Sequence, residues 1–92
     1  MDFGQIEAFV QVAAHRSFSR AAEQLQLTQP SITARIQSLE RDLGETLFER
    51  NGRGVSLTEA GAAFMPHAQR VLKALQDGRD AIQSLQQLEL GT

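Results

Sequence analysis

The strongest constraint on the fold of this chain is the segment 18–57, in which signals for two helices and a hairpin follow closely on one another. Ser17 and Ser19 are candidate N-caps of a short helix, because a hydroxyl at this position accepts a free backbone N–H. Thr28 is the expected N-cap of a second helix, and Pro30 lies in its first turn, where a missing N–H costs nothing. The segment therefore predicts two consecutive helices joined by a tight connection.

The second of these helices has two different faces, and Gly44 is expected to end it. Its apolar side chains recur at i, i+4, i+7 and i+11, so they must face a core. They are Ile32, Ile36, Leu39 and Leu43. The residues that point away are Pro30, Ala34, Gln37 and Arg41, with Thr33 and Arg35 on the flanks.

The elements before and after this pair complete a small domain. A first helix is expected from about residue 3 to 15, with an apolar stripe formed by Ile6, Phe9, Val10 and Ala13. Two very short strands are expected at 47–50 and 55–57. The turn between them is expected at Asn51-Gly52, since both residues tolerate a positive φ. The order predicts a mainly α fold, a winged helix-turn-helix with a short two-stranded wing. The common use of this shape is to place one helix in the DNA major groove.

A long helix is expected to begin after its N-cap, Thr58, and to reach about Leu88. Its apolar residues recur at alternating three- and four-residue steps, a heptad seam rather than a broad core-facing stripe. Pro66 lies within this pattern and is expected to kink the helix locally. A second copy of the chain is the simplest symmetric partner for the seam. The expected dimerisation residues are Phe64, Ala68, Val71, Leu75, Ile82 and Leu85, with Gly61 and Gly78 at further positions of the same seam. We therefore divide the chain into a winged helix-turn-helix domain, 1–57, and a linker or dimerisation segment, 58–92.

Net charge argues against DNA binding, because nine basic and eleven acidic residues give −2, whereas DNA-binding domains are often strongly basic. The distribution of charge argues the other way. No acidic residue lies within 24–39 or within 50–58, the two segments expected to face DNA.

Other functions find little support in the composition. The lack of cysteine excludes disulfides, zinc fingers and thiol chemistry. The two histidines, His15 and His67, stand far apart, and no serine has a recognisable base and acid partner, so we expect no catalytic or metal site. No signal-peptide pattern or membrane-length apolar run occurs, so we expect a cytoplasmic protein without a membrane partner.

The candidate base reader is Gln29, whose amide is able to pair bidentately with adenine N6 and N7. Thr33 is able to hydrogen-bond a base edge or touch a thymine methyl. Pro30 and Ser31 are expected against the sugar-phosphate wall. Arg50 and Arg53 of the hairpin are candidates for backbone or minor-groove contacts.

Simpler interpretations remain open at this point. The three helices could form a plain bundle, although this leaves the polar face of the third helix unexplained. The hairpin could be a solvated turn with two incidental arginines. A different function is a protein–protein interaction module that uses the winged helix only as a dimerisation scaffold.

Several runs together carry a family resemblance: Ser19–Leu25, Leu27–Thr33, Leu47–Arg50 and Leu57–Gly61, with Leu39-Glu, Leu43-Gly and Arg53 between them. The chain closely resembles, over essentially its whole length, the N-terminal domain of the LysR-type transcriptional regulators of bacteria. The resemblance implies an antiparallel dimer through the long helix and binding to interrupted inverted repeats of the T-N11-A kind in promoters. It also implies a tetrameric full-length protein with a C-terminal effector domain of periplasmic-binding-protein type.

That effector domain would bind a small-molecule inducer, and no cofactor is expected in the present chain. Residues 88–92 resemble the first strand of the effector domain, so we expect the chain to be a fragment. Carried over by position, the base contacts fall at Gln29, Pro30 and Thr33. One departure is Ala34, where several members have a long polar or basic side chain, followed by Arg35. The full set of expected DNA-binding residues is Thr28, Gln29, Pro30, Ser31, Thr33, Ala34, Arg35, Arg50 and Arg53.

Overall fold

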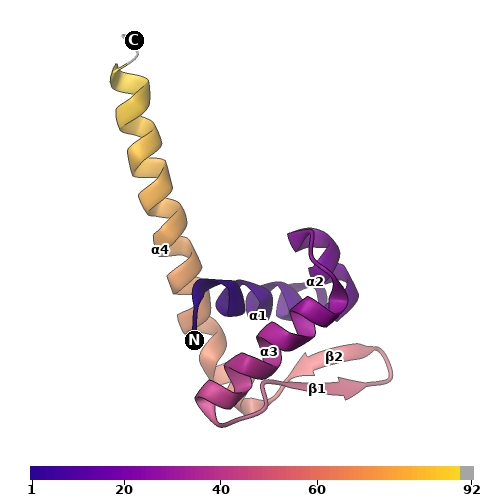
Figure 1. The fold of residues 1–92 in the computed structure, drawn as a ribbon. Helices are drawn as coiled ribbons and strands as arrows, with labels where there is room; N and C mark the ends of the chain where they lie inside the picture. The colour runs from indigo at the N-terminus through magenta and orange to yellow at the C-terminus, as the bar shows by residue number, and fades with distance from the viewer. Residues whose placement is uncertain (90–92) are drawn as a thin grey trace.

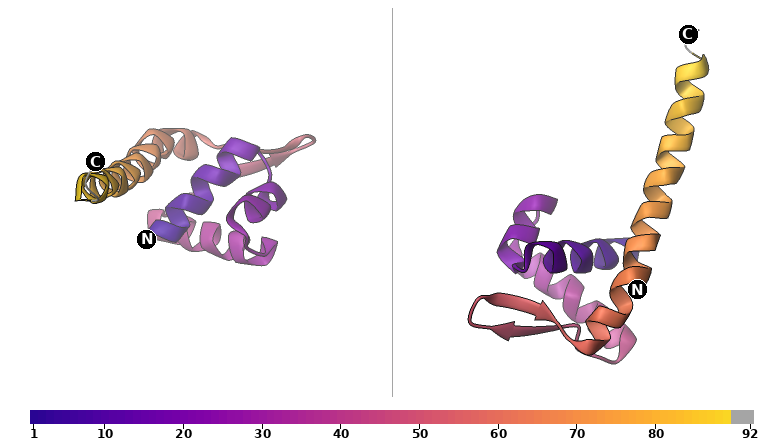
Figure 2. Two further views of the ribbon diagram at one scale, coloured as in Figure 1. Left: turned by 90° about the horizontal axis from the view of Figure 1, so that it is seen from above. Right: turned by 180° about the vertical axis from the view of Figure 1, so that it is seen from behind.

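The computed structural model describes residues 1–89, which form a small helical body with a hairpin and one projecting helix (Figure 1). The elements are α1 (Phe3–His15), α2 (Phe18–Leu25), α3 (Gln29–Leu43), β1 (Phe48–Asn51), β2 (Gly54–Leu57) and α4 (Glu59–Glu89). Figure 2 shows that α1, α2 and α3 lie together, that the hairpin extends to one side and that α4 leaves the body. This order confirms the predicted winged helix-turn-helix.

Side-chain caps define where the helices begin. Ser17 Oγ accepts the Arg20 N–H at 3.1 Å, so Ser17 is the N-cap of α2, whereas Ser19 lies inside its first turn. Thr28 caps α3 by accepting the Ser31 N–H at 3.2 Å. Gly44 ends that helix with a left-handed backbone (φ 73°), as predicted.

The core lies where α1, α3, the hairpin and the start of α4 meet. Its largest fully buried side chains are Phe9, Val12, Ile32, Leu39 and Leu47. Ile6 and Phe9 of the predicted stripe of α1 are buried and Val10 packs against the core, but Ala13 is only half-buried, and the buried Ala8 and Val12 were not predicted. The predicted core face of α3 is confirmed, because Ile32, Ile36 and Leu39 are buried and Leu43 packs against the core.

The hairpin is a two-stranded antiparallel sheet in which Phe48 pairs with Leu57 and Asn51 with Gly54. The loop residues are therefore Gly52 and Arg53, one position later than the predicted Asn51-Gly52 turn. The positive φ (126°) falls on Gly54. A Cβ at Gly54 would lie 2.6 Å from the Arg16 carbonyl oxygen, so only glycine fits there.

The beginning of α4 belongs to the core rather than to a free seam. Ala68 is buried, and the Phe64 ring lies 5.4 Å from that of Phe9. Gly61 approaches the backbone of Leu47 so closely that a Cβ would lie 2.2 Å from its carbonyl oxygen. The chain itself covers Gly61 and Ala68, so neither is free to join a seam with a second copy, whereas Phe64 is half-buried and its place in a dimer contact stays a prediction.

The rest of α4 projects into solvent (Figure 1). The helix continues through Pro66 without interruption. The large apolar side chains of its outer part, Val71, Leu75, Ile82, Leu85 and Leu88, are between 42% and 69% exposed. Leu88 and Glu89 are helical, so that part of the predicted strand at 88–92 is wrong, and residues 90–92 lie outside the described part of the chain.

Candidate nucleic-acid interface

The exposed face of α3 is a shallow hollow of about 490 Å³ lined by Gln29, Pro30, Thr33, Ala34 and Gln37. The apolar positions 32, 36 and 39 anchor the opposite face in the core, so this polar face must point outward. At the helix start, Thr28 Oγ1 donates to Ser31 Oγ at 2.9 Å, which holds both hydroxyls beside the free N–H groups of the first turn. The structure thus brings six of the predicted DNA-binding residues to one surface: Thr28, Gln29, Pro30, Ser31, Thr33 and Ala34.

Gln29 is held by a partner that the sequence alone did not reveal. Ser19 Oγ, from the first turn of α2, donates to Gln29 Oε1 at 3.0 Å. Both side chains are exposed. The amide oxygen of the candidate base reader is thus hydrogen-bonded to α2.

The base of the wing lies beside this face. Thr33 of α3 and Arg50 of β1 line one cavity of about 170 Å³, together with Phe18 of α2. The Arg50 guanidinium carbon lies 5.2 Å from the centre of the Phe18 ring, a cation–π contact. The guanidinium thus lies next to the polar face of α3, beside Thr33.

The tip of the wing carries Arg53, held by a network around Asn51. Asn51 Oδ1 accepts the backbone N–H of Arg53 at 3.0 Å, and Asn51 Nδ2 donates to Ser56 Oγ at 3.2 Å. Arg16 borders the same hollow as Arg53. Arg16, immediately before the α2 cap, was not among the predicted site residues, although its charge and place in the sequence are visible there.

Arg35 lies apart from the other candidates. Its guanidinium covers Gly4 in the first turn of α1, where an added Cβ would lie 2.5 Å from Nη1. Arg35 is half-buried, whereas Ala34 is exposed in the polar hollow of α3. The two residues therefore face different surroundings, and Arg35 does not occupy the space that Ala34 leaves open.

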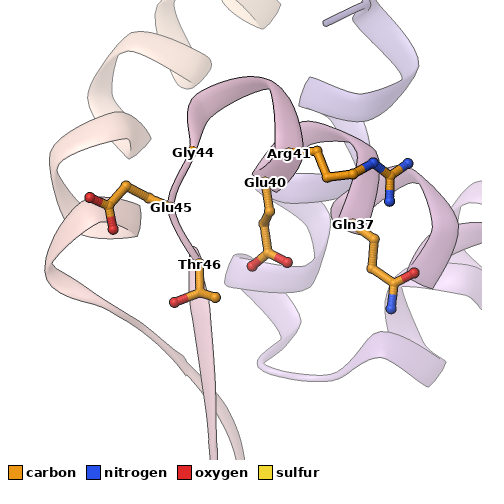
Figure 3. A pocket seen from close by; sticks show the side chains of 6 residues that line it. All are labelled: Gln37, Glu40, Arg41, Gly44, Glu45 and Thr46. Atoms are coloured by element: carbon orange, nitrogen blue, oxygen red, sulfur yellow. The ribbon is translucent and has the colours of Figure 1, made fainter.

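A second cleft, of about 380 Å³, lies at the opposite end of α3, between Gln37 and Thr46. Figure 3 shows that the Arg41 and Glu45 side chains point in opposite directions there, while the Glu40 side chain turns toward the segment that leads into β1. The Glu40 carboxylate accepts the Leu47 N–H at 2.7 Å. These groups do not converge on a common point, and Glu40 serves to join α3 to the wing.

Ionisable groups in the described residues show little sign of a reactive centre. No three His, Cys, Asp or Glu side chains within 1–89 lie close enough together to hold a metal ion. The hydrogen bond to Asp42 raises the pKa of the Met1 ammonium above its ordinary value of 8.0, and this ion pair joins the start of α1 to the end of α3.

None of the helices within residues 1–89 combines the length and the apolar character that crossing a membrane requires.

The fold and the geometry of the site together place this chain in the class of winged helix-turn-helix domains. The family model for "Bacterial regulatory helix-turn-helix protein, lysR family" matches residues 3–62, more than half of the chain. The chain therefore belongs to the LysR family.

Two relatives illustrate the similarity. The chain is 49% identical over 85 residues to an uncharacterized HTH-type transcriptional regulator in the ibpB-leuC intergenic region of Azotobacter vinelandii, covering 92% of this chain and 59% of that protein. It is 41% identical over 88 residues to the HTH-type transcriptional regulator CfxR of Cupriavidus necator, covering 96% of this chain and 28% of that protein. The chain thus spans between about a quarter and three fifths of the length of these two regulators.

The solved structures that the chain matches include complexes with DNA. The chain matches the CbnR DBD–DNA complex with 40% identity and a TM-score of 0.81, covering 92% of this chain and 98% of that one. It matches the BenM DBD/catB site 1 DNA complex with 32% identity and a TM-score of 0.85, covering 92% of this chain and 96% of that one. The relatives are named as regulators and not as enzymes.

Proposed function

We propose that this chain is the DNA-binding part of a bacterial transcriptional regulator that recognises an interrupted inverted repeat, of the T-N11-A type, as a homodimer. The observation that carries the proposal is the exposed hollow on α3, whose lining residues include no acidic side chain. Arg50 of the wing lines the neighbouring cavity together with Thr33 and Glu40. DNA complexes among the structural relatives support this choice of ligand.

Gln29 and Thr33 read base edges in the major groove. A glutamine amide pairs bidentately with adenine, and a threonine either bonds a base edge or touches a thymine methyl. Ala34, exposed beside them, offers its methyl group to a thymine in the same way. Pro30 packs against the sugar-phosphate wall.

The remaining contacts position the protein on the backbone. Thr28 and Ser31 lie at the start of α3, where free N–H groups and the helix dipole favour a phosphate. Arg50 and Arg53 contact phosphates or the minor groove from the base and the tip of the wing. Arg35, over Gly4, lies at the flank of α3 and meets phosphates rather than bases.

The outer part of α4 forms the dimer contact. Leu72 is the last α4 side chain that packs against the core, and beyond it apolar residues continue at heptad spacing. Val71, Leu75, Ile82 and Leu85 are 42%, 45%, 59% and 61% exposed and make a stripe that a second copy would cover. A dimer binds DNA more tightly than a single copy does. When one copy is bound to its half-site, the other copy is held at a high effective concentration near the second half-site.

The whole regulator would add the features implied by its family. We infer a tetramer with a C-terminal effector domain that binds a small-molecule inducer, acting in the cytoplasm where bacterial promoters lie. The segments 1–57 and 58–92 would then act as DNA reader and dimerising linker.

A salt titration tests the proposal against the alternative of a protein–protein interaction module. Duplexes retained by the protein are first selected from a random pool and sequenced, which identifies the half-sites. Affinity for the selected duplex is then measured as salt rises, and it should fall with a logarithmic slope of about −0.9 per phosphate neutralised. Failure to retain any duplex at low salt would contradict DNA binding and favour the interaction module.

A further inference from the structure

A hydrogen bond joins the first turn of α2 to the first turn of α3. Ser19 Oγ donates to Gln29 Oε1 at 3.0 Å. The helix caps are supplied by other residues, Ser17 and Thr28, so this bond is not needed to start either helix. We propose that Ser19 is a positioning residue that orients the Gln29 amide for base recognition, an inference that rests on the function proposed above.

The backbone around both residues is already held. Ala21 and Ala22 of α2 are buried in the core, which fixes the inner face of that helix. The Leu27 N–H donates to the Ala22 carbonyl at 2.9 Å and closes the connection between α2 and α3. The backbone positions of Ser19 and Gln29 are therefore held, so the bond depends only on the rotamers of these two side chains.

The bond defines what Gln29 offers to a base. With the Ser19 proton on Oε1, one lone pair of that oxygen and both Nε2 protons remain free. Adenine recognition uses one acceptor for N6 and one donor for N7. The orientation held by Ser19 therefore leaves available the pair of groups that adenine requires.

Removing the hydroxyl should reduce selectivity rather than general affinity. A free glutamine side chain must be ordered on binding and is able to present either end of its amide to a base. We expect Ser19→Ala to lower the preference for the Gln29-contacted base over the other three by about 2- to 10-fold, the size of one net hydrogen bond. Affinity for a duplex with scrambled half-sites should change less than about 2-fold.

A double-mutant cycle measures the coupling. Ser19→Ala, Gln29→Ala and the double variant are titrated against the selected duplex and its single-base variants, with Ser84→Ala, an exposed serine of α4, as the matched control. Ser19→Ala should have no further effect on selectivity once Gln29 is absent, and Ser19→Thr, which keeps the hydroxyl, should restore it. An equal loss on every duplex, or unchanged selectivity, would overturn the inference, because Ser19 would then act on phosphates or only on the fold.

A measurement without DNA separates this inference from the proposed function. In the free protein, NMR relaxation of the Gln29 side-chain amide should show slower motion than that of Gln37, an exposed glutamine of the same helix. Ser19→Ala should bring the two amides to the same mobility. Equal mobility in the unmodified protein would overturn the positioning role even if DNA binding is selective. Failure of the unmodified protein to bind DNA would overturn both proposals.

Discussion

Gly61 is the position where adding a single methyl group should destabilise this fold most. It lies in the first turn of α4, against Leu47, which precedes β1, and Leu57, which ends β2. A Cβ there would lie 2.2 Å from the Leu47 carbonyl oxygen and 2.9 Å from Leu57 Cδ2. The Leu47 carbonyl cannot turn aside freely, because it accepts the Thr58 N–H at 3.0 Å. Gly61→Ala should therefore push α4 away from the wing.

The size of the effect follows from two opposing contributions. Alanine is favoured over glycine in a helix by about 1 kcal/mol. Ordinary contacts need about 3.5 Å, so the methyl group is too close by more than about 1 Å. Overpacking of this kind costs about 1–3 kcal/mol, and we take the upper end because backbone must move. The net loss is about 2 kcal/mol, which lowers Tm by about 8–16 °C in a domain of this size.

Urea unfolding followed by circular dichroism, at one fixed protein concentration, measures this loss. Gly52→Ala, in the loop of the wing, is the matched control, because a Cβ there meets nothing within 4 Å. The control should leave stability unchanged or raise it by up to about 1 kcal/mol. A Gly61→Ala variant as stable as the parent, or an equal loss in Gly52→Ala, would contradict the predicted clash.

Four further changes test the other surfaces. Gln29→Ala should weaken binding to a duplex with the cognate base of Gln29 by roughly 1–3 kcal/mol and relax selectivity at that base. An equal loss of affinity for all duplexes in the titration would instead show that Gln29 only positions the protein on DNA. Arg53→Ala should weaken binding to all duplexes evenly and reduce the salt slope by about 1; an unchanged slope contradicts the phosphate contact. Ile82→Glu should raise the dimer dissociation constant about 10-fold or more in sedimentation, since a buried isoleucine contributes about 1.5–3 kcal/mol, and an unchanged dimer would show that the stripe on α4 is not the contact. The Met1 ammonium, whose pKa is raised in the fold, should stabilise the protein below pH 8 and lose this effect as pH rises through the raised pKa. Unfolding at several pH values should show that Asp42→Asn removes this part of the pH dependence, and an identical dependence in the variant would contradict the ion pair.

Features that depend on neighbours in the chain could be predicted from the sequence. The cap at Thr28, the end of α3 at Gly44 and the core face at Ile32, Ile36 and Leu39 are all confirmed. Each of these features results from local hydrogen bonding or helical periodicity, so a short stretch of sequence is enough to predict it.

Features that depend on distant contacts could not be predicted in this way. Phe64 and Ala68 fit a heptad seam as well as a core, and only the folded chain shows that Ala68 is buried and that the Phe64 ring packs against Phe9. The wing turn lies one residue later than predicted, and Gly54, which follows it, packs against the carbonyl of the distant Arg16. The bond between Ser19 and Gln29 and the position of Arg35 over Gly4 depend in the same way on how separate helices meet.

The central claim is that two copies of this chain read two half-sites on one face of duplex DNA. The most direct measurement is the affinity for the selected inverted repeat before and after about 5 base pairs, half a helical turn, are inserted between its half-sites. The account predicts that the insertion reduces the affinity to that of a duplex with a single half-site. An affinity independent of the spacing would contradict it.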